Sequence, residues 1–182
     1  MRLLLSLALC AAVITSPALA ASPAEPHLRP QDDRLRQLLR QGTARSTTLK
    51  ALVDRIEASQ VIVYVAINPV MKSNLSGMLT WMTRAGDYRY LRASISPKLS
   101  PDQMIATIAH ELQHAVEVIE DAAVNDEMSL IALYKRIGQQ RGGSSPMQWD
   151  TSAAQRTGLL VRQELSGVPT ATIARAGVKA RS

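Results

Sequence analysis

The chain has 182 residues, the length of a single domain, and its one cysteine excludes a scaffold held by internal disulfides. Its net charge of +6 comes from scattered basic residues, without the basic stripe and interleaved aromatics that nucleic-acid binding predicts. We therefore expect a basic solvated surface and no nucleic-acid partner. Phe is absent and aromatic residues make up 3% of the chain, so a core must be built from aliphatic side chains and Met.

Residues 1–20 are typical of a secretory signal peptide. Arg2 precedes an apolar run, Leu3 to Ile14, that is too short to span a bilayer, and Ala18-Leu19-Ala20 offers the small residues of a cleavage site. An uncleaved anchor is the alternative. Cleavage would remove Cys10, and an exported domain without disulfides is more typical of a bacterial periplasm or medium. We expect a secreted or periplasmic protein with no stable membrane span once the signal is removed.

The next segments predict a flexible leader, two helices and three strands. Residues 21–30 are rich in Pro, Ala and Ser, which favours a flexible leader, and a folded domain is expected over 31–169. Apolar residues recur at helical spacing over 32–41 and 47–58. The β-branched run 61–67 predicts a buried strand, and segments 75–84 and 88–96, joined by Ala85-Gly86-Asp87, predict a hairpin.

Three further helices follow. Ser100-Pro101-Asp102-Gln103 has the residues of a capping box with Pro at the first helical position, so a helix should run from there to about 119. Others are expected from 125 or 126 to 137 and from about 150 to 165, and the tail 170–182 is expected to be disordered. The order of elements predicts an α+β fold, with a small antiparallel sheet of about three strands packed on helices.

The helix after the hairpin contains His110-Glu111-Leu112-Gln113-His114. Two histidines four residues apart differ by about 40° around a helix, so both imidazoles can reach one metal ion. Glu111 is placed to take a proton from a water molecule that such a metal activates. The pattern therefore predicts His110 and His114 as ligands of Zn²⁺ and Glu111 as the general base.

The rest of this helix agrees with a metal site. An apolar stripe that includes Ile105, Leu112 and Val116 lies opposite the two histidines, so the helix has separate faces for the core and for chemistry. The alternative is a pair of surface histidines on a polar face. The third histidine, His27, falls in the expected leader, so both histidines of the domain lie in the motif.

The motif and its context resemble the zincin metallopeptidases, in which a strand precedes the HExxH helix and lines the substrate cleft. Residues 108–117 also resemble a group of small, uncharacterised bacterial exported proteins with the same motif. These carry a Leu-Tyr-x-x-Ile-Gly segment, matched by 133–138, and an aromatic-Glu-Thr-x-x-Ala segment, matched by 149–154 with Asp150 in place of Glu. The resemblance covers about residues 60 to 167 and implies zinc hydrolysis, without a substrate.

The third ligand has more than one carboxylate candidate. The metzincin pattern would need a histidine at position 120, where Glu120 stands, so a histidine ligand is excluded. Glu120 could bind the metal if the helix ended there, and Asp121 shares that possibility. The gluzincin-like pattern instead takes a carboxylate from a later helix, which implies Asp150. The alternative role for Asp150 is to cap its own helix. Glu117, one turn beyond His114, could orient that imidazole.

The predicted function is therefore an exported zinc-dependent metallopeptidase that hydrolyses peptide or cell-envelope amide bonds in a peptide or protein substrate. The strand 88–96 could pair with an extended substrate. Tyr64, Tyr88 and Tyr90 are candidates to stabilise an oxyanion, although sheet packing is their more frequent role. The alternatives are a metal- or peptide-binding module without turnover, and an inactive protein whose two leading helices cover the cleft. Oligomeric state is left open.

Overall fold

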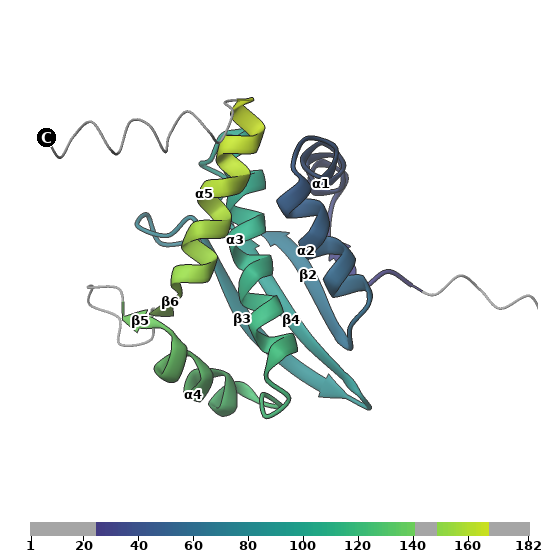
Figure 1. Cartoon of the computed structure of the whole chain (residues 1–182), viewed down its shortest axis with the longest axis vertical. Coiled ribbons are helices and arrows are strands. Elements are labelled where there is room, and N and C mark those ends of the chain that lie inside the picture. Colours follow the sequence, from purple (N-terminus) through teal and green to yellow (C-terminus); the bar gives the residue numbers. More distant parts are fainter. Residues whose placement is uncertain (1–24, 141–148, 168–182) are drawn as a thin grey trace, which may run out of the picture.

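The computed structural model describes residues 25–140 and 149–167, which form two sheets and five helices (Figure 1). In chain order the elements are β1 (Leu28–Pro30), α1 (Asp33–Arg45), α2 (Thr47–Glu57), β2 (Val61–Ile67), β3 (Gly77–Ala85), β4 (Tyr88–Ile95), α3 (Pro101–Glu120), α4 (Glu127–Ile137), β5 (Gln139–Gln140), β6 (Trp149–Asp150) and α5 (Ser152–Ser166). The predicted α+β class is confirmed. The predicted signal peptide and tail, 1–20 and 170–182, lie outside the described residues.

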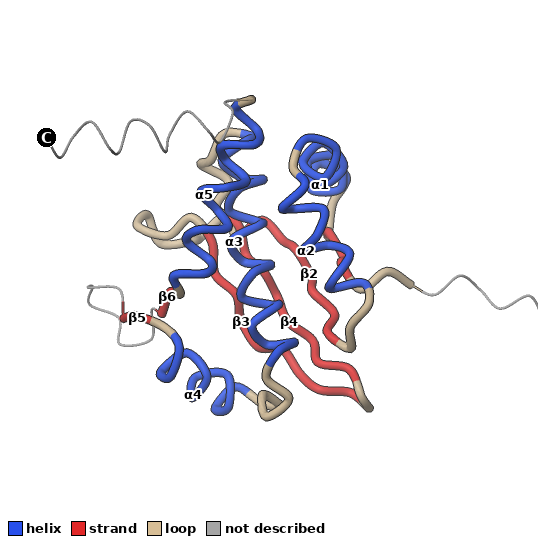
Figure 2. The backbone as a smooth tube through the Cα atoms, in the orientation of Figure 1, coloured by secondary structure: helices blue, strands red, loops and turns tan. Residues whose placement is uncertain are grey.

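The main sheet is mixed, with the strand order β1-β2-β4-β3 (Figure 2). β1, β2 and β4 run parallel, and only the hairpin pair β3 and β4 is antiparallel. The prediction of an antiparallel sheet of three strands is therefore wrong. The reason lies in β4, which returns from the hairpin and inserts between β2 and β3. The apolar run of β2, with five of its seven residues buried, is typical of a strand inside a parallel pair.

The expected leader also ends earlier than predicted. Leu28 to Pro30 forms β1, which pairs with residues 63–65 of β2, and the side chain of Leu28 is buried. His27 lies against the ring of Tyr88, with 5.4 Å between ring centroids, and so packs on the start of β4. The folded domain therefore begins before residue 31, and the flexible-leader prediction must be corrected over 28–30.

Helix α3 crosses one face of the sheet, with α5 on one side of it and α1 and α2 on the other (Figure 1). Its start is fixed locally, since Ser100 accepts from the Gln103 amide and the Gln103 side chain accepts from the Ser100 amide. Its end is held by Arg89 of β4, which donates to the carbonyls of Val118 and Asp121. The helix is thus anchored at both ends and packed between layers. None of the described helices is both long enough and apolar enough to cross a membrane.

Candidate metal centre

The histidine motif lies in the middle of α3, between the sheet and α5. The side chains of Glu111 and His114 are buried, with 4% and 5% of their surface exposed, and His110 is half-buried. The helix face predicted to be polar is therefore covered by protein. The alternative of two surface histidines is wrong for His114, because a surface side chain would not be enclosed in this way.

Asp150 lies directly opposite the two imidazoles, in β6 just before α5. Its Oδ1 atom is 3.2 Å from Nε2 of His110 and 3.7 Å from Nε2 of His114. The two rings stand edge to face with their centroids 5.0 Å apart. One donor atom from each of the three residues falls within 4.8 Å of the others. The structure thus brings together the two histidines and Asp150, the carboxylate candidate that lies furthest along the chain.

Two of the donor separations suit the coordination of one divalent metal ion. Metal–ligand bonds of about 2.0–2.2 Å in a tetrahedral site place neighbouring donor atoms about 3.3 Å apart. The observed separations of 3.2 and 3.7 Å from Asp150 lie close to that value. Two imidazoles and one carboxylate also form the three-ligand set that leaves a fourth position for water. The residues present could therefore hold a divalent metal ion.

A buried hydrogen-bond chain orients His114. Its Nδ1 atom lies 2.8 Å from a carboxylate oxygen of Glu117, and the other oxygen of Glu117 accepts from the Thr151 hydroxyl at 2.5 Å. A carboxylate on Nδ1 fixes the tautomer that leaves the Nε2 lone pair free for a metal. Glu117 is 6% exposed, so the interaction is shielded from water. The expectation that Glu117 orients this imidazole matches the geometry.

The surroundings of His114 favour positive charge. Burial alone would lower the pKa of its imidazole, but the hydrogen bond to Glu117 and the negative charges of Glu111, Glu117 and Asp150 outweigh it and raise that pKa. These carboxylates would attract a metal cation for the same electrostatic reason. The site therefore combines suitable donors with an electrostatic preference for a cation.

Asp150 does not cap α5. The cap is Thr151, whose side chain accepts from the amide of Ala154, and the helix begins at Ser152. Asp150 Oδ1 accepts from the Thr151 amide at 2.8 Å, and its Oδ2 accepts from Nε2 of Gln155 at 3.2 Å. The capping alternative for Asp150 is therefore wrong, because one residue later in the chain performs that role. Its carboxylate is held in place at the side of the histidines.

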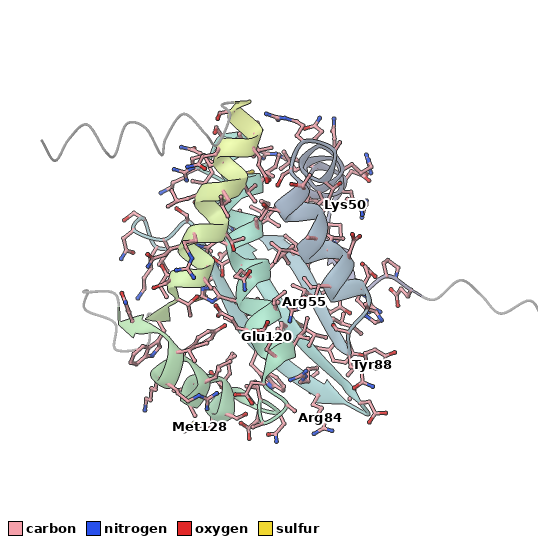
Figure 3. All side chains as sticks on the ribbon, in the orientation of Figure 1. Lys50, Arg55, Arg84, Tyr88, Glu120 and Met128 are labelled. Atoms are coloured by element: carbon pink, nitrogen blue, oxygen red, sulfur yellow. The ribbon has the colours of Figure 1, made fainter. Side chains whose placement is uncertain are left out.

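Glu120 and Asp121 lie away from the donor cluster. Glu120 is an exposed residue that pairs with Arg55 of α2 at 2.6 Å, and the two side chains can be seen together between α2 and α3 (Figure 3). Asp121 pairs with Arg136 of α4, and this contact lowers the pKa of its carboxyl. Helix α3 continues through Glu120, which turns that side chain away from His110 and His114. The structure does not support Glu120 as the third ligand.

Glu111 points at the start of β3. A Cβ atom added to Gly77 would lie 2.5 Å from Oε1 of Glu111 and 2.7 Å from a methyl group of Thr107. Real Cβ atoms essentially never come that close to another heavy atom, so a side chain at position 77 would force the carboxylate of Glu111 to shift. Gly77 thus sets the space in which Glu111 sits beside the histidines.

A hollow of about 460 Å³ opens in front of the cluster. It is lined by the three ligand candidates and Glu111, by the β3 residues from Gly77 to Trp81, and by Tyr134 of α4. That ring stands edge to face on His114, with 5.2 Å between centroids. Burial and the nearby carboxylates raise the pKa of Tyr134 well above its usual value, so it stays a neutral phenol at ordinary pH. No residue of α1 or α2 lines the hollow, so the expectation that the leading helices cover the cleft does not hold for it.

The strand beside the hollow is β3. The strand predicted to pair with substrate, 88–96, corresponds to β4, which is hydrogen-bonded to β2 on one side and to β3 on the other. It has no free edge, so that prediction is wrong. Among the described residues, β3 pairs with β4 alone. The edge strand of the sheet is therefore the one that borders the donor cluster.

Comparisons with protein-family profiles, with curated proteins and with solved structures found no match to this chain. The zincin resemblance thus rests on the motif and its context, and a metal at this site stays a prediction. Sequence reasoning missed Thr151, Tyr134 and Gly77 as neighbours of the cluster. Tyr134 lay in a segment that carried the resemblance, whereas Gly77 had no local signal. Of the tyrosines considered as oxyanion donors, Tyr64 is instead bonded to Arg29, with 3.1 Å between Nη1 and the hydroxyl.

Proposed function

We propose that the protein is a zinc-dependent hydrolase that cleaves peptide or cell-envelope amide bonds, with His110, His114 and Asp150 as metal ligands and Glu111 as general base. The single observation that carries this proposal is the convergence of three suitable donor atoms within 4.8 Å, from α3 and from a segment 36 residues or more further along the chain. A metal ion bound there would supply Lewis acidity to a water molecule and to a substrate carbonyl.

In this proposal Glu111 transfers the protons of the reaction. Hydrolysis of an amide forms a bond between the water oxygen and the carbonyl carbon and breaks the C–N bond, and one water proton must reach the leaving nitrogen. A carboxylate beside the donor cluster can accept that proton and pass it on. Glu111 lines the hollow together with the two histidines and is otherwise enclosed by Gly77 and Thr107. The neighbouring edge strand offers main-chain groups that could align an extended substrate.

Export through the predicted signal peptide remains part of the proposal. It would bring the mature chain to the periplasm or the medium, where peptides and cell-envelope amides are available. Fractionation of cells that express the full chain, with N-terminal sequencing of the exported product, tests this part. Cleavage next to Ala20 is expected, and retention of the intact chain in the cytoplasm would overturn it.

Replacing Glu111 by Gln tests the hydrolase itself. Glu111→Gln keeps the shape of the side chain but removes the proton acceptor, so we expect metal binding to persist and hydrolysis to fall by about a hundredfold or more. The measurement is cleavage of a mixture of internally quenched peptides by the zinc-loaded protein, with metal content determined in parallel. The control is Glu120→Gln, an equal change on the exposed side of the same helix. Activity that survives Glu111→Gln unchanged would exclude the general-base role.

A further inference from the structure

A second hollow, of about 380 Å³, lies on the other side of the motif. The two hollows share Leu75, Gly77, His110 and Glu111, so they meet at the donor cluster and form one groove. The first hollow follows β3 from Gly77 to Trp81, and the second reaches from Leu75 to α5. A chain lying along the edge of β3 would therefore pass the cluster with one half in each hollow.

The two halves of this groove differ in chemistry. The first hollow is walled mainly by large apolar side chains, namely Met71, Leu79, Trp81, Leu130, Ile131 and Trp149. Its charged rim residues, Lys72 and Glu127, have opposite signs. Apart from the residues of the motif, one charged residue among those described lines the second hollow, namely Arg162 of α5. One half thus suits a bulky apolar side chain, and the other presents a single positive charge.

Arg162 is available to bind an anion. It is exposed, and within residues 25–140 and 149–167 no carboxylate forms an ion pair with it, whereas Arg45, Arg55 and Arg136 each have one. Gly158 lies one helical turn before it, on the same face of α5. A Cβ atom at Gly158 would lie 3.4 Å from Cβ of His110. Because residue 158 is glycine, this position places no side chain between His110 and the helical turn that carries Arg162. Gly158, His110 and Arg162 all line the second hollow.

From these contacts we infer that the groove selects peptides with a bulky apolar residue before the scissile bond and a carboxylate after it, held by Arg162. This inference rests on the proposed hydrolase function. The direction follows from antiparallel pairing with β3, the more stable arrangement per residue. A peptide antiparallel to β3 runs from the level of Trp81 towards Leu75, so its C-terminal half enters the hollow that contains Arg162. The carboxylate belongs either to an acidic side chain or to the peptide's own C-terminus.

Binding to an inactive variant tests the inference without turnover. The protein is zinc-loaded Glu111→Gln, and the probes are fluorescein-labelled peptides with Phe or Leu in the N-terminal half and either Glu or Gln in the C-terminal half. With amidated ends, we expect the Glu peptides to bind about threefold to fivefold more tightly than the Gln peptides, as befits a partly exposed ion pair. Gln peptides with free and with amidated C-termini form the second arm, which separates a terminal carboxylate from an acidic side chain.

Arg162→Ala, introduced into the Glu111→Gln protein, should bring the ratio of the affinities for the carboxylate-bearing and neutral peptides close to one. Arg156→Ala should leave this ratio unchanged. Arg156 is an exposed arginine of the same helix that lines neither hollow. A preference that persists in Arg162→Ala, or no preference in either arm, would overturn the inference. Tighter binding of peptides that carry Glu in the N-terminal half, instead of the C-terminal half, would overturn the assigned direction. If these peptides bind as expected but the wild-type protein cleaves none of them, the hydrolase proposal fails while the recognition stands.

Discussion

At the scale of single residues, the site depends on how closely other groups approach the motif. The carboxylate of Glu117 is buried between the imidazole of His114 and the hydroxyl of Thr151, so it fixes a ring on α3 to the cap of α5. That arrangement links the position of His114 to the position of Asp150, which immediately precedes the cap. A carboxylate that accepts a hydrogen bond from a metal-binding imidazole holds that ring in orientation, and its loss commonly lowers metal affinity by about tenfold to a hundredfold.

Gly77→Ala is expected to lower hydrolysis by about tenfold to a hundredfold with little change in bound metal. The added methyl group would occupy space 2.5 Å from Oε1 of Glu111, so that carboxylate must move, whereas the atoms nearest to the methyl group belong to Glu111 and Thr107 and not to a ligand candidate. The measurement is peptide cleavage together with metal content. Thr83→Ala, at an exposed position of the same strand, is the control. Equal activity in Gly77→Ala and the wild type would mean that Glu111 does not need its present position.

At the scale of elements, α5 is tied to the start of α2 through Glu164. Its carboxylate accepts from the hydroxyls of Ser46, Thr47 and Thr48 and from the amide of Thr48. The side chain thus satisfies donors at the N-terminus of a helix. Since α5 also carries the wall of the second hollow, this contact helps to position α5 against the rest of the domain.

Glu164→Gln should lower the free energy of unfolding at pH 7 by about 1 kcal/mol. Partial burial would raise the pKa of Glu164, but the hydrogen bonds from Ser46, Thr48 and Thr47 outweigh it and lower that pKa below its usual 4.5. Because the folded state binds the proton less readily than the unfolded state, the stabilisation is present above pH 4.5 and is lost as pH falls through the lower folded value. Urea unfolding at pH 7 and pH 3.5 measures it.

The difference in the free energy of unfolding between the wild type and Glu164→Gln should therefore be smaller at pH 3.5 than at pH 7. Glu120→Gln is the matched control, since it removes one carboxylate from a single exposed ion pair and should change stability less. A loss of stability in Glu164→Gln that is as large at pH 3.5 as at pH 7 would show that the charge of the carboxylate is not what stabilises the contact.

At the scale of the whole molecule, the features that the sequence predicted are those that depend on residues close together in the chain. The β-branched run gave β2 with the observed bounds, and the capping box gave the start of α3. The parallel pairing of β1, β2 and β4 was not predicted, because it depends on how the hairpin folds back between two strands far apart in the chain. Asp150 was favoured only through resemblance. Its position beside His110 is set by the packing of α5 on α3, which no local pattern encodes.

The metal content of the purified mature chain tests the central claim most directly. We predict one zinc ion per chain after equilibration with zinc and removal of excess metal, as measured by elemental mass spectrometry. Asp150→Ala should lose most of this metal, because it removes one of three donor residues, while Glu120→Ala should keep it, since that carboxylate pairs with Arg55 on the far side of the helix. A metal-free wild-type chain, or full metal content in Asp150→Ala with loss in Glu120→Ala, would contradict the account.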